Sequence, residues 1–374
     1  MTRAATVLLP AWLLAVPLTG QDLAAERDRV MKAVAPVKDV DLPLRPLQEG
    51  LGLVFVREVR EPGASSLRLR FAVDNAPDAG ASWAIQVKDA AGQLAWSAWA
   101  GDVAGAAFWS DEIEGEAARV EVYSARPANP VLLRIDKLVA PTRKVEPLSI
   151  TGDRNDLASI SIQGHDPWIV DRGRSVARVR YVGDNGAAYS CTAFLVTRDL
   201  MLTNQHCIAT PSEMDSALVD FDFDAQGARP KTSRLRELLQ TNFALDYALV
   251  RLKKPVDRAP LRLDAAHPPD REQLLIIQHP NGEPKQISLR DCKVDGTLVH
   301  GRREPGTDFA HQCDTMSGSS GSPVLRFGTK TVVGLHHLGY DAQAVFNRAV
   351  HIDRVLADLS PAHRAEVEAG QPRP

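Results

Sequence analysis

Apolar and polar residues alternate with a period of two in several short runs in the first half of the chain. In the clearest run, 67–73, leucine, phenylalanine and valine alternate with arginine and alanine. The alternation returns at 83–87, 120–122 and 133–135, and clusters of Gly, Pro, Asn and Asp separate the runs. Such runs between turn residues are typical of strands with one buried face. Residues 47–140 are therefore predicted to form an antiparallel β-sandwich.

Short strand-like runs resume in the second half of the chain. They lie at 176–182, 192–196, 248–252, 274–277 and 331–335. Helical spacing is clear mainly near the end, where Ile352, Val355, Leu356 and Leu359 share one apolar face. Residues 175–374 are therefore predicted to form an all-β domain closed by a C-terminal helix.

The segments around these domains are interpreted from their turn residues. Residues 21–46 begin with a charged, Ala-rich stretch and continue into a series of prolines, which predicts a leader helix or a linker. Residues 141–174 contain scattered Pro and Gly and are predicted to connect the two domains. Two domains also fit the length of 374 residues, because a single hydrophobic core rarely grows to that size.

Residues 1–20 resemble an export signal. Arg3 precedes an apolar run that is short for a membrane span and contains Pro10 and Pro17. An uncleaved membrane anchor is the alternative for this segment. No later stretch is apolar enough to span a bilayer, so the mature chain is expected to be secreted or periplasmic, without membrane association once the signal is removed.

The composition narrows the range of partners. A hydrophobic content of 44% and a charged content of 24% are those of an ordinary globular protein. Basic and acidic residues nearly cancel, leaving a formal net charge of -3. Nucleic-acid binding normally needs a basic excess that neutralises phosphates, so no nucleic-acid partner is expected.

All four cysteines lie in the second half of the chain, at Cys191, Cys207, Cys292 and Cys313. An even number in a chain expected to be exported favours disulfides over metal ligation. The cysteines also lack the close spacing of a zinc site.

Other candidate ligand residues form no metal-binding pattern. Asp220, Asp222 and Asp224 alternate with apolar residues, which predicts a strand with a solvated face, and a calcium site is the lesser alternative. Three histidines lack metal-ligand spacing and are expected to be solvated or hydrogen bonded: His279, His300 and His311. No metal and no cofactor are therefore expected.

Three segments carry candidate chemistry. His206 follows a strand-like run, Asp246 opens another, and Ser320 lies in a turn of small residues at 317–324. Attack on an amide needs a hydroxyl activated by an imidazole, and an acid that orients the imidazole. His206 is therefore predicted to take the proton from Ser320, while Asp246 orients the ring.

Backbone groups of the same turn are predicted to complete the site. The N–H groups of Gly318 and Ser320 can bind the oxyanion, and glycine allows the turn that points both at one place. The order His, Asp, Ser along the chain is that of trypsin-like peptidases and differs from α/β-hydrolases and subtilisin-type enzymes. Ser317, Ser319 and Ser322 are alternative nucleophiles, but only Ser320 holds the central G-x-S-G position.

Residues 175–359 resemble the chymotrypsin-fold serine peptidases and, within them, bacterial glutamyl endopeptidases. The segment Leu202-Thr-Asn-Gln-His206 resembles the Leu-Thr-x-x-His segment of that family, and Gly318-Ser-Ser-Gly-Ser-Pro323 resembles its G-N-S-G-S-P turn. The resemblance implies a chymotrypsin-like double β-barrel of two six-stranded barrels, with the catalytic residues in the cleft between them. It also implies a Cys191–Cys207 disulfide. Cys292 and Cys313 are then expected to form the second disulfide, and free buried thiols are the alternative.

The resemblance extends to the primary specificity pocket. Residues 333–339 and 346–350 look like its walls, which implies that His336 and Thr315 contact an acidic side chain and that cleavage follows Glu. Two positions depart from the pattern. Leu338 replaces a glycine of the pocket wall, and Ser319 stands where trypsin has the aspartate that pairs with a new N-terminus, so activation by that ion pair is not expected.

These residues together predict a secreted serine endopeptidase that cleaves polypeptides through an acyl-enzyme, with the sandwich as a targeting, substrate-binding or pro-domain. The alternative is a binding or adhesion protein with a non-catalytic, peptidase-like scaffold, and an esterase is a third interpretation. The tryptophans of the sandwich indicate whether it binds a ligand. Buried tryptophans belong to its core, and exposed ones would indicate a carbohydrate or protein ligand. They are Trp83, Trp96, Trp99 and Trp109.

Overall fold

The computed structural model of the chain is mostly β, with 47% of residues in strands and 11% in helices. It describes residues 31–44, 52–73, 83–100, 107–124, 132–142, 150, 155–339 and 346–372. The predicted export signal, 1–20, and the first part of the predicted leader, 21–30, lie outside the described residues. Within the described ranges, no helix has the length and apolar character needed to cross a membrane.

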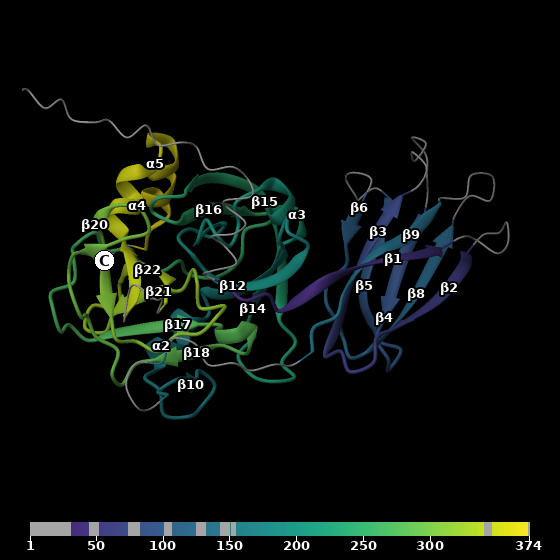
Figure 1. Cartoon of the computed structure of the whole chain (residues 1–374), viewed down its shortest axis with the longest axis horizontal. Helices are drawn as coiled ribbons and strands as arrows, with labels where there is room; N and C mark the ends of the chain where they lie inside the picture. The colour runs from purple at the N-terminus through teal and green to yellow at the C-terminus, as the bar shows by residue number, and fades with distance from the viewer. Residues whose placement is uncertain are drawn as a thin grey trace, which may run out of the picture.

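Two antiparallel sheets form a sandwich, to the right in Figure 1. One has the strand order β2 (Gly52–Arg60), β8 (Ala117–Ser124), β4 (Trp83–Lys88) and β5 (Leu94–Trp99). The other has the order β1 (Ala35–Leu44), β9 (Leu133–Val139), β3 (Ser66–Val73) and β6 (Ala107–Trp109), and β7 (Ile113–Glu114) also pairs with β3. Alternate residues of both sheets meet in one buried core that includes Leu69, Phe71, Ile85, Val120 and Ile135.

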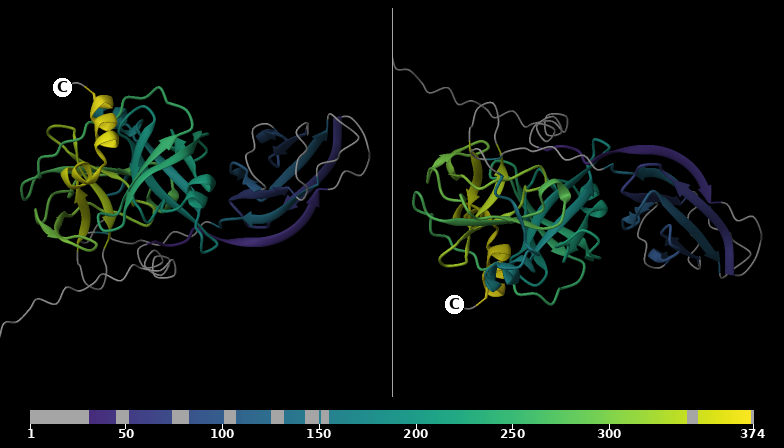
Figure 2. Two further views of the ribbon diagram at one scale, coloured as in Figure 1. Left: turned by 90° about the horizontal axis from the view of Figure 1, so that it is seen from above. Right: turned by 90° about the horizontal axis from the view of Figure 1, so that it is seen from below.

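The prediction of a leader helix or a linker at 21–46 is wrong for Ala35–Leu44, which form strand β1. Ala35 and Pro36 pair with β12 (Ala187–Leu195), and the remainder of β1 pairs with β9, so the strand runs from one module into the other (Figure 2). Among the described strands, the first two residues of β1 pair only with β12, and the rest of β1 pairs only with β9. Proline lacks an N–H and is tolerated at such free edges. Pro36 and Pro43, two of the prolines that suggested a linker, are therefore compatible with a strand.

The next six strands close into a barrel. Their order is β11 (Val176–Val182), β14 (Leu218–Phe221), β15 (Lys231–Asn242), β16 (Tyr247–Leu252), β13 (Leu200–Thr203) and β12, and the pairing of β11 with β12 completes the circle. Helix α3 (Pro211–Ser216) contacts β11 and β15. Apolar residues of alternate positions fill this barrel, which accounts for the period-two pattern found at 176–182.

The C-terminal half forms an eight-stranded sheet. Its order is β10 (Ala158–Ser159), β18 (Gln286–Ser288), β17 (Leu274–Gln278), β21 (Pro323–Arg326), β22 (Val332–Leu338), β23 (Asn347–His351), β20 (Pro305–His311) and β19 (Val299–His300). Helices α4 (Ile352–Asp358) and α5 (Pro361–Gly370) follow the sheet, in agreement with the prediction that the domain ends in a helix. The remaining short elements are α2 (Pro167–Gly173) and the 3-10 turn η2 (Pro280–Gly282).

One apolar core joins the two halves of this region. It contains Phe194 and Leu249 from the first barrel, Ile277 and Leu335 from the second half, and Ile169 from α2. The predicted connection 141–174 therefore contributes to the core through α2 and also supplies β10. The fold class is confirmed: a β-sandwich precedes a chymotrypsin-like all-β region that ends in helices.

Polar contacts attach the sandwich to the first barrel. Arg180 of β11 pairs with Glu112, and Arg234 of β15 donates to Asp111 at 2.8 Å. Arg68 of β3 is buried and donates to the backbone oxygen of Ser216 at 2.7 Å. A cavity of about 1070 Å³ lies between the modules and reaches the turn at Ser317 and Gly318.

Candidate active site

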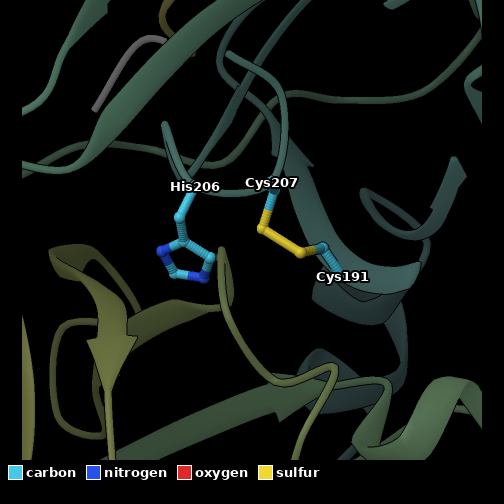
Figure 3. Close-up of side chains that lie close together, drawn as sticks. All are labelled: Cys191, His206 and Cys207. Atoms are coloured by element: carbon cyan, nitrogen blue, oxygen red, sulfur yellow. A yellow bond between two sulfur atoms is a disulfide. The ribbon is translucent and has the colours of Figure 1, made fainter. Parts of the chain in front are cut away.

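A disulfide and a tight turn position the histidine. Strand β13 ends at Thr203, and the Cys207 amide donates to the Asn204 carbonyl at 3.2 Å, which turns the chain at His206. Cys207 is bonded to Cys191 of β12, so the ring lies directly beside the disulfide (Figure 3). Both sulfurs are committed to this bond and cannot ligate a metal together with the histidine.

Asp246 lies opposite the ring, in a backbone conformation that side chains rarely adopt. Its φ is 54° and it immediately precedes β16. Its Oδ2 lies 2.7 Å from Nδ1 of His206, and its Oδ1 accepts from the His206 amide at 3.0 Å. The carboxylate therefore fixes both the ring and the backbone of the histidine, which leaves Nε2 for other chemistry.

Two further donors contact the same carboxylate. Nη1 of Arg302 lies 2.9 Å from Oδ1 of Asp246, and Nδ1 of His337 lies 3.2 Å from Oδ2. Burial alone would raise the pKa of Asp246, but the electrostatic attraction of His206 and Arg302 and the hydrogen bonds from His206 and His337 hold that pKa well below its usual range. Asp246 is therefore an anion at any pH relevant to catalysis.

The imidazole of His206 is buried and is held neutral. Burial lowers the pKa of His206, Asp246 opposes this, and the positive charges of Arg302 and His337 lower the pKa further. Nε2 is buried and has no hydrogen-bond partner in the described part of the chain. A neutral imidazole with Nδ1 held by a carboxylate has its lone pair at Nε2, the form required of a general base.

Backbone hydrogen bonds bring the Ser320 turn to this ring. The Thr192 amide donates to the Ser320 carbonyl at 2.8 Å, and the Thr192 hydroxyl donates to the Gly318 carbonyl at 2.9 Å. Thr192 is adjacent to Cys191, whose disulfide partner is adjacent to His206. The serine turn and the histidine are therefore tied to neighbouring residues of β12.

The hydroxyl groups of the turn distinguish the candidate nucleophiles. The Ser319 hydroxyl accepts from the Met316 amide at 3.0 Å, and the Ser322 hydroxyl donates to the Ser319 carbonyl. The Ser317 hydroxyl accepts from the Lys32 amide at 3.3 Å. Of these four serines, only Ser320 has a hydroxyl that makes no hydrogen bond to the described residues. In particular, no hydrogen bond joins the Ser320 hydroxyl to His206 in the described part of the chain.

The same turn presents unused backbone donors. Gly318 and Gly321 have φ values of 90° and 88°, which allow the chain to reverse on both sides of Ser320. The amides of Ser319, Gly321 and Ser322 donate to carbonyl groups, whereas those of Gly318 and Ser320 donate to none of the described residues. Two free amides beside a free hydroxyl form the arrangement that an oxyanion site requires.

The predicted specificity residues are both buried, at 1% exposure for Thr315 and 3% for His336. His336 is linked to the serine turn, because its carbonyl accepts from Gly321 and its amide donates to Ser322. Nδ1 of His336 lies 3.1 Å from Nε2 of His311. Burial, with His311 and His337 nearby, lowers the pKa of His336 well below the usual value. Within the described residues, no hydrogen bond joins Thr315 to His336.

Both expected disulfides are present. Cys292 and Cys313 are bonded to each other, as are Cys191 and Cys207, and none of the described cysteines is a free thiol.

The prediction of a solvated aspartate face is wrong for Asp220, whereas the side chains of Asp222 and Asp224 are partly exposed, at 30% and 37%. Asp220 is fully buried and accepts from Arg178 and Arg180, while Asp222 pairs with Arg258 and Asp224 with Lys285. Each carboxylate thus has a cationic partner from a distant part of the chain, which period-two patterning does not reveal.

Each of the three histidines expected to be solvated or hydrogen bonded makes a polar contact, and the three differ in exposure. Nδ1 of His279 lies 3.0 Å from the Glu283 carbonyl, and His300 is exposed, with Nδ1 2.8 Å from the Gly301 carbonyl. His311 is buried against His336.

Sequence reasoning missed Arg302, Asp308 and His337 as parts of the site. The only sequence signal for His337 is its place in a His-His pair at the end of a strand-like run. Arg302 lies in a polar loop, where an arginine is ordinarily exposed.

Comparison with protein families places these residues in a peptidase-like segment. Residues 191–335 match the family model described as "Trypsin-like peptidase domain". The matched segment contains His206, Asp246 and Ser320, and the activity it indicates is that of a serine peptidase.

Two curated proteins are similar to parts of this chain. "Secreted RxLR effector protein 73" of Plasmopara viticola is 34% identical over 173 residues, which are 41% of this chain and 42% of that protein. "Uncharacterized protein y4fB" of Sinorhizobium fredii is 33% identical over 189 residues, which are 46% of this chain and 28% of that protein. The chain thus spans less than half the length of these relatives.

Solved structures of proteases are also similar. The active form of the Rv3671c protease from M. tuberculosis is 18% identical, covering 62% of this chain and 97% of that one, with a TM-score of 0.39. The serine endoprotease from Yersinia pestis is 15% identical, covering 54% and 66%, with a TM-score of 0.40.

Proposed function

We propose that this chain is an exported serine endopeptidase in which Ser320 is the nucleophile, His206 the general base and Asp246 the orienting acid. The observation that carries the proposal is the free Nε2 of His206, whose Nδ1 is held by Asp246. Beside it lies the turn in which Ser320, alone among the four serines at 317–322, has a hydroxyl without a hydrogen bond to the described residues. We expect the Ser320 hydroxyl to donate to Nε2 when substrate binds.

The reaction follows from these positions. The Ser320 oxygen bonds to the carbonyl carbon of the peptide as its proton passes to Nε2 of His206, and the carbonyl oxygen becomes an anion facing the amides of Gly318 and Ser320. Collapse of this intermediate releases the amine, which takes the proton from His206, and leaves an acyl-enzyme. Water then repeats the sequence and releases the acid.

We extend the proposal to a preference for Glu before the scissile bond. The supporting observation is the buried pair of neutral histidines, His311 and His336, next to the serine turn. A buried imidazole N–H can donate to a carboxylate. Export is supported by the two disulfides, which persist in oxidising compartments.

Labelling with a fluorophosphonate tests the nucleophile, because only an activated serine reacts with it. We expect the full chain to be labelled on Ser320 and Ser320→Ala to be unlabelled, with Ser317→Ala as a matched control that retains labelling. A wild-type chain that stays unlabelled at every pH would favour the binding-protein alternative. Peptide hydrolysis then separates a peptidase from an esterase.

A peptide panel that varies the residue before the scissile bond tests the preference. We expect kcat/KM to be highest for Glu, with the Glu-to-Gln ratio reduced about tenfold or more in His336→Ala, as the loss of one charge-assisted hydrogen bond requires. A panel led by Lys, Arg or Leu would overturn the preference and leave the peptidase proposal intact.

We further propose that the sandwich binds a protein or carbohydrate ligand through its outer face. Of its tryptophans, Trp83 and Trp96 belong to the core cluster, whereas Trp99 is 59% exposed at one end of β5, and Leu94 at the other end of that strand is also exposed. Retention on immobilised polysaccharides or denatured protein, compared with Trp99→Ala, tests this role. Equal retention of both proteins would contradict it.

A further inference from the structure

We infer that His337 is a positioning residue that holds a fixed positive charge behind Asp246 and thereby sets the pH range in which His206 can act as a base. This inference rests on the proposed function, because it assigns a role within the same site. Its physical basis is a buried row of charged groups from separate elements.

Both ring nitrogens of His337 contact carboxylates. Nδ1 lies 3.2 Å from Oδ2 of Asp246, and Nε2 lies 2.6 Å from Oδ2 of Asp308. Each nitrogen must carry a hydrogen to donate to its carboxylate, and a ring with both hydrogens is a cation. The His337 ring is fully buried, so water does not replace either partner.

The surroundings favour this cation. Asp308 of β20 is 1% exposed, and its other oxygen accepts from the Thr307 hydroxyl. Burial opposes protonation of His337, yet the two carboxylates raise its pKa to about 9. Since this value lies above neutral pH, His337 stays charged across the range in which a peptidase of this class works.

The titratable groups around Asp246 come from several elements of the fold. The loop after β13 contributes His206, the loop after β19 contributes Arg302, and β22 contributes His337 and His336. Strand β20 contributes Asp308 and His311. Strand β23 contributes Arg348, whose positive charge is one cause of the lowered pKa of Asp308. His311 and His336 are neutral, because burial lowers both pKa values.

The row formed by Asp246, Asp308, His337 and Arg302 therefore contains two negative and two positive charges. Protonation of His206 beside a lone aspartate would neutralise a buried charge. Beside this row it adds a net positive charge to a buried site, which is unfavourable in a low dielectric. His206 is thus kept neutral, and able to accept a proton, at a lower pH than it would be without His337.

The contacts indicate the size of the effect. His206 and His337 touch the same oxygen of Asp246 at 2.7 and 3.2 Å. Their Nδ1 atoms therefore lie within about 6 Å of each other, where removal of one charge, partly balanced by Asp308, corresponds to a shift of about one pH unit.

The test is the pH dependence of kcat/KM for the full chain on a peptide substrate. His337→Asn keeps a donor toward Asp246 but removes the charge. We expect the acid limb of the profile to move up by about one pH unit, with the plateau changed about threefold or less. His337→Gln also removes the charge while keeping a donor, and should shift the limb in the same direction, which covers the case in which His337→Asn fails to fold.

Matched controls separate this role from a structural one. His165→Asn removes a histidine outside the row, whose Nε2 contacts the Ser159 carbonyl, and should leave the limb in place. A lower plateau with an unmoved limb in both His337→Asn and His337→Gln would show a purely structural role and overturn the inference.

NMR titration of His206 in the Ser320→Ala background gives an answer without turnover. The midpoint should rise by about one unit in His337→Asn. Equal midpoints, or a neutral His337 ring at pH 7, would refute the inference. If the wild-type chain neither hydrolyses peptides nor labels with the fluorophosphonate, the proposed function fails, while this titration still decides the role of His337.

Discussion

Gly321, directly after the candidate nucleophile, offers the sharpest test of how the serine turn is held. A Cβ placed there would lie 1.9 Å from the backbone oxygen of Thr192 and 2.5 Å from the hydroxyl oxygen of Thr203. The Thr192 oxygen cannot easily withdraw, because it accepts from the Thr203 hydroxyl at 2.8 Å while the amide of Thr192 holds Ser320. In Gly321→Ala the serine turn itself must therefore move.

The cost can be worked from two contributions. An L-residue at a φ of 88° is strained by about 1–2 kcal/mol, and forcing a methyl group into packed surroundings costs about 1–3 kcal/mol. The free energy of unfolding should thus fall by about 2–5 kcal/mol, which lowers the melting temperature by roughly 5–15 °C in a domain of this size. A displacement of Ser320 by about 1 Å should reduce kcat/KM by about 100-fold.

Three measurements check this prediction: thermal unfolding by circular dichroism, the rate of fluorophosphonate labelling, and peptide hydrolysis well below the melting temperature. Gly328→Ala is the matched control, because a Cβ at Gly328 meets no atom within 4 Å and the residue has no positive φ. It should stay within about 0.5 kcal/mol of wild type. A Gly321→Ala protein that labels and melts like the control would refute the account of the turn.

Three further predictions concern stability. Removing the Cys191–Cys207 disulfide, which spans 16 residues, should lower the free energy of unfolding by about 3 kcal/mol in urea titrations, and an unchanged midpoint would count against its structural role. Asp220→Ala removes a buried carboxylate from Arg178 and Arg180, which retain Glu112, and should cost about 3 kcal/mol by the same assay, whereas surface substitutions usually stay within about 0.5 kcal/mol. A hydrogen bond from a lysine lowers the pKa of Glu121 to about 2, so its contribution is complete above the unfolded pKa of about 4.3 and is lost as pH falls toward 2. Glu121→Gln should therefore flatten the stability-against-pH curve in that interval, and an equally steep curve would contradict the assignment.

Local patterning predicted most of the strands because burial on one face leaves a direct mark on the sequence. The run at 176–182 coincides with β11, and the runs at 67–73 and 83–87 lie within one residue of the bounds of β3 and β4. Strand β1 was missed because its prolines carry the ordinary signal of a linker. Its pairing with two different partners is a property of the assembled molecule.

The candidate site shows the same division. His206, Asp246 and Ser320 stand in short, recognisable segments whose order along the chain already indicates acyl transfer. The number and positions of the cysteines likewise predicted disulfides. These are statements about residue types and spacing, and such statements need no coordinates.

Tertiary structure alone decided the electrostatics of the site. Arg302 and His337 reach Asp246 across 56 and 91 positions of sequence, and Asp308 reaches His337 across 29. Charges act through space and grow stronger as water is excluded, so their effect depends on which groups the fold buries together. The sequence by itself determined which chemistry we propose for the chain, whereas the fold determined which charges surround the proposed base.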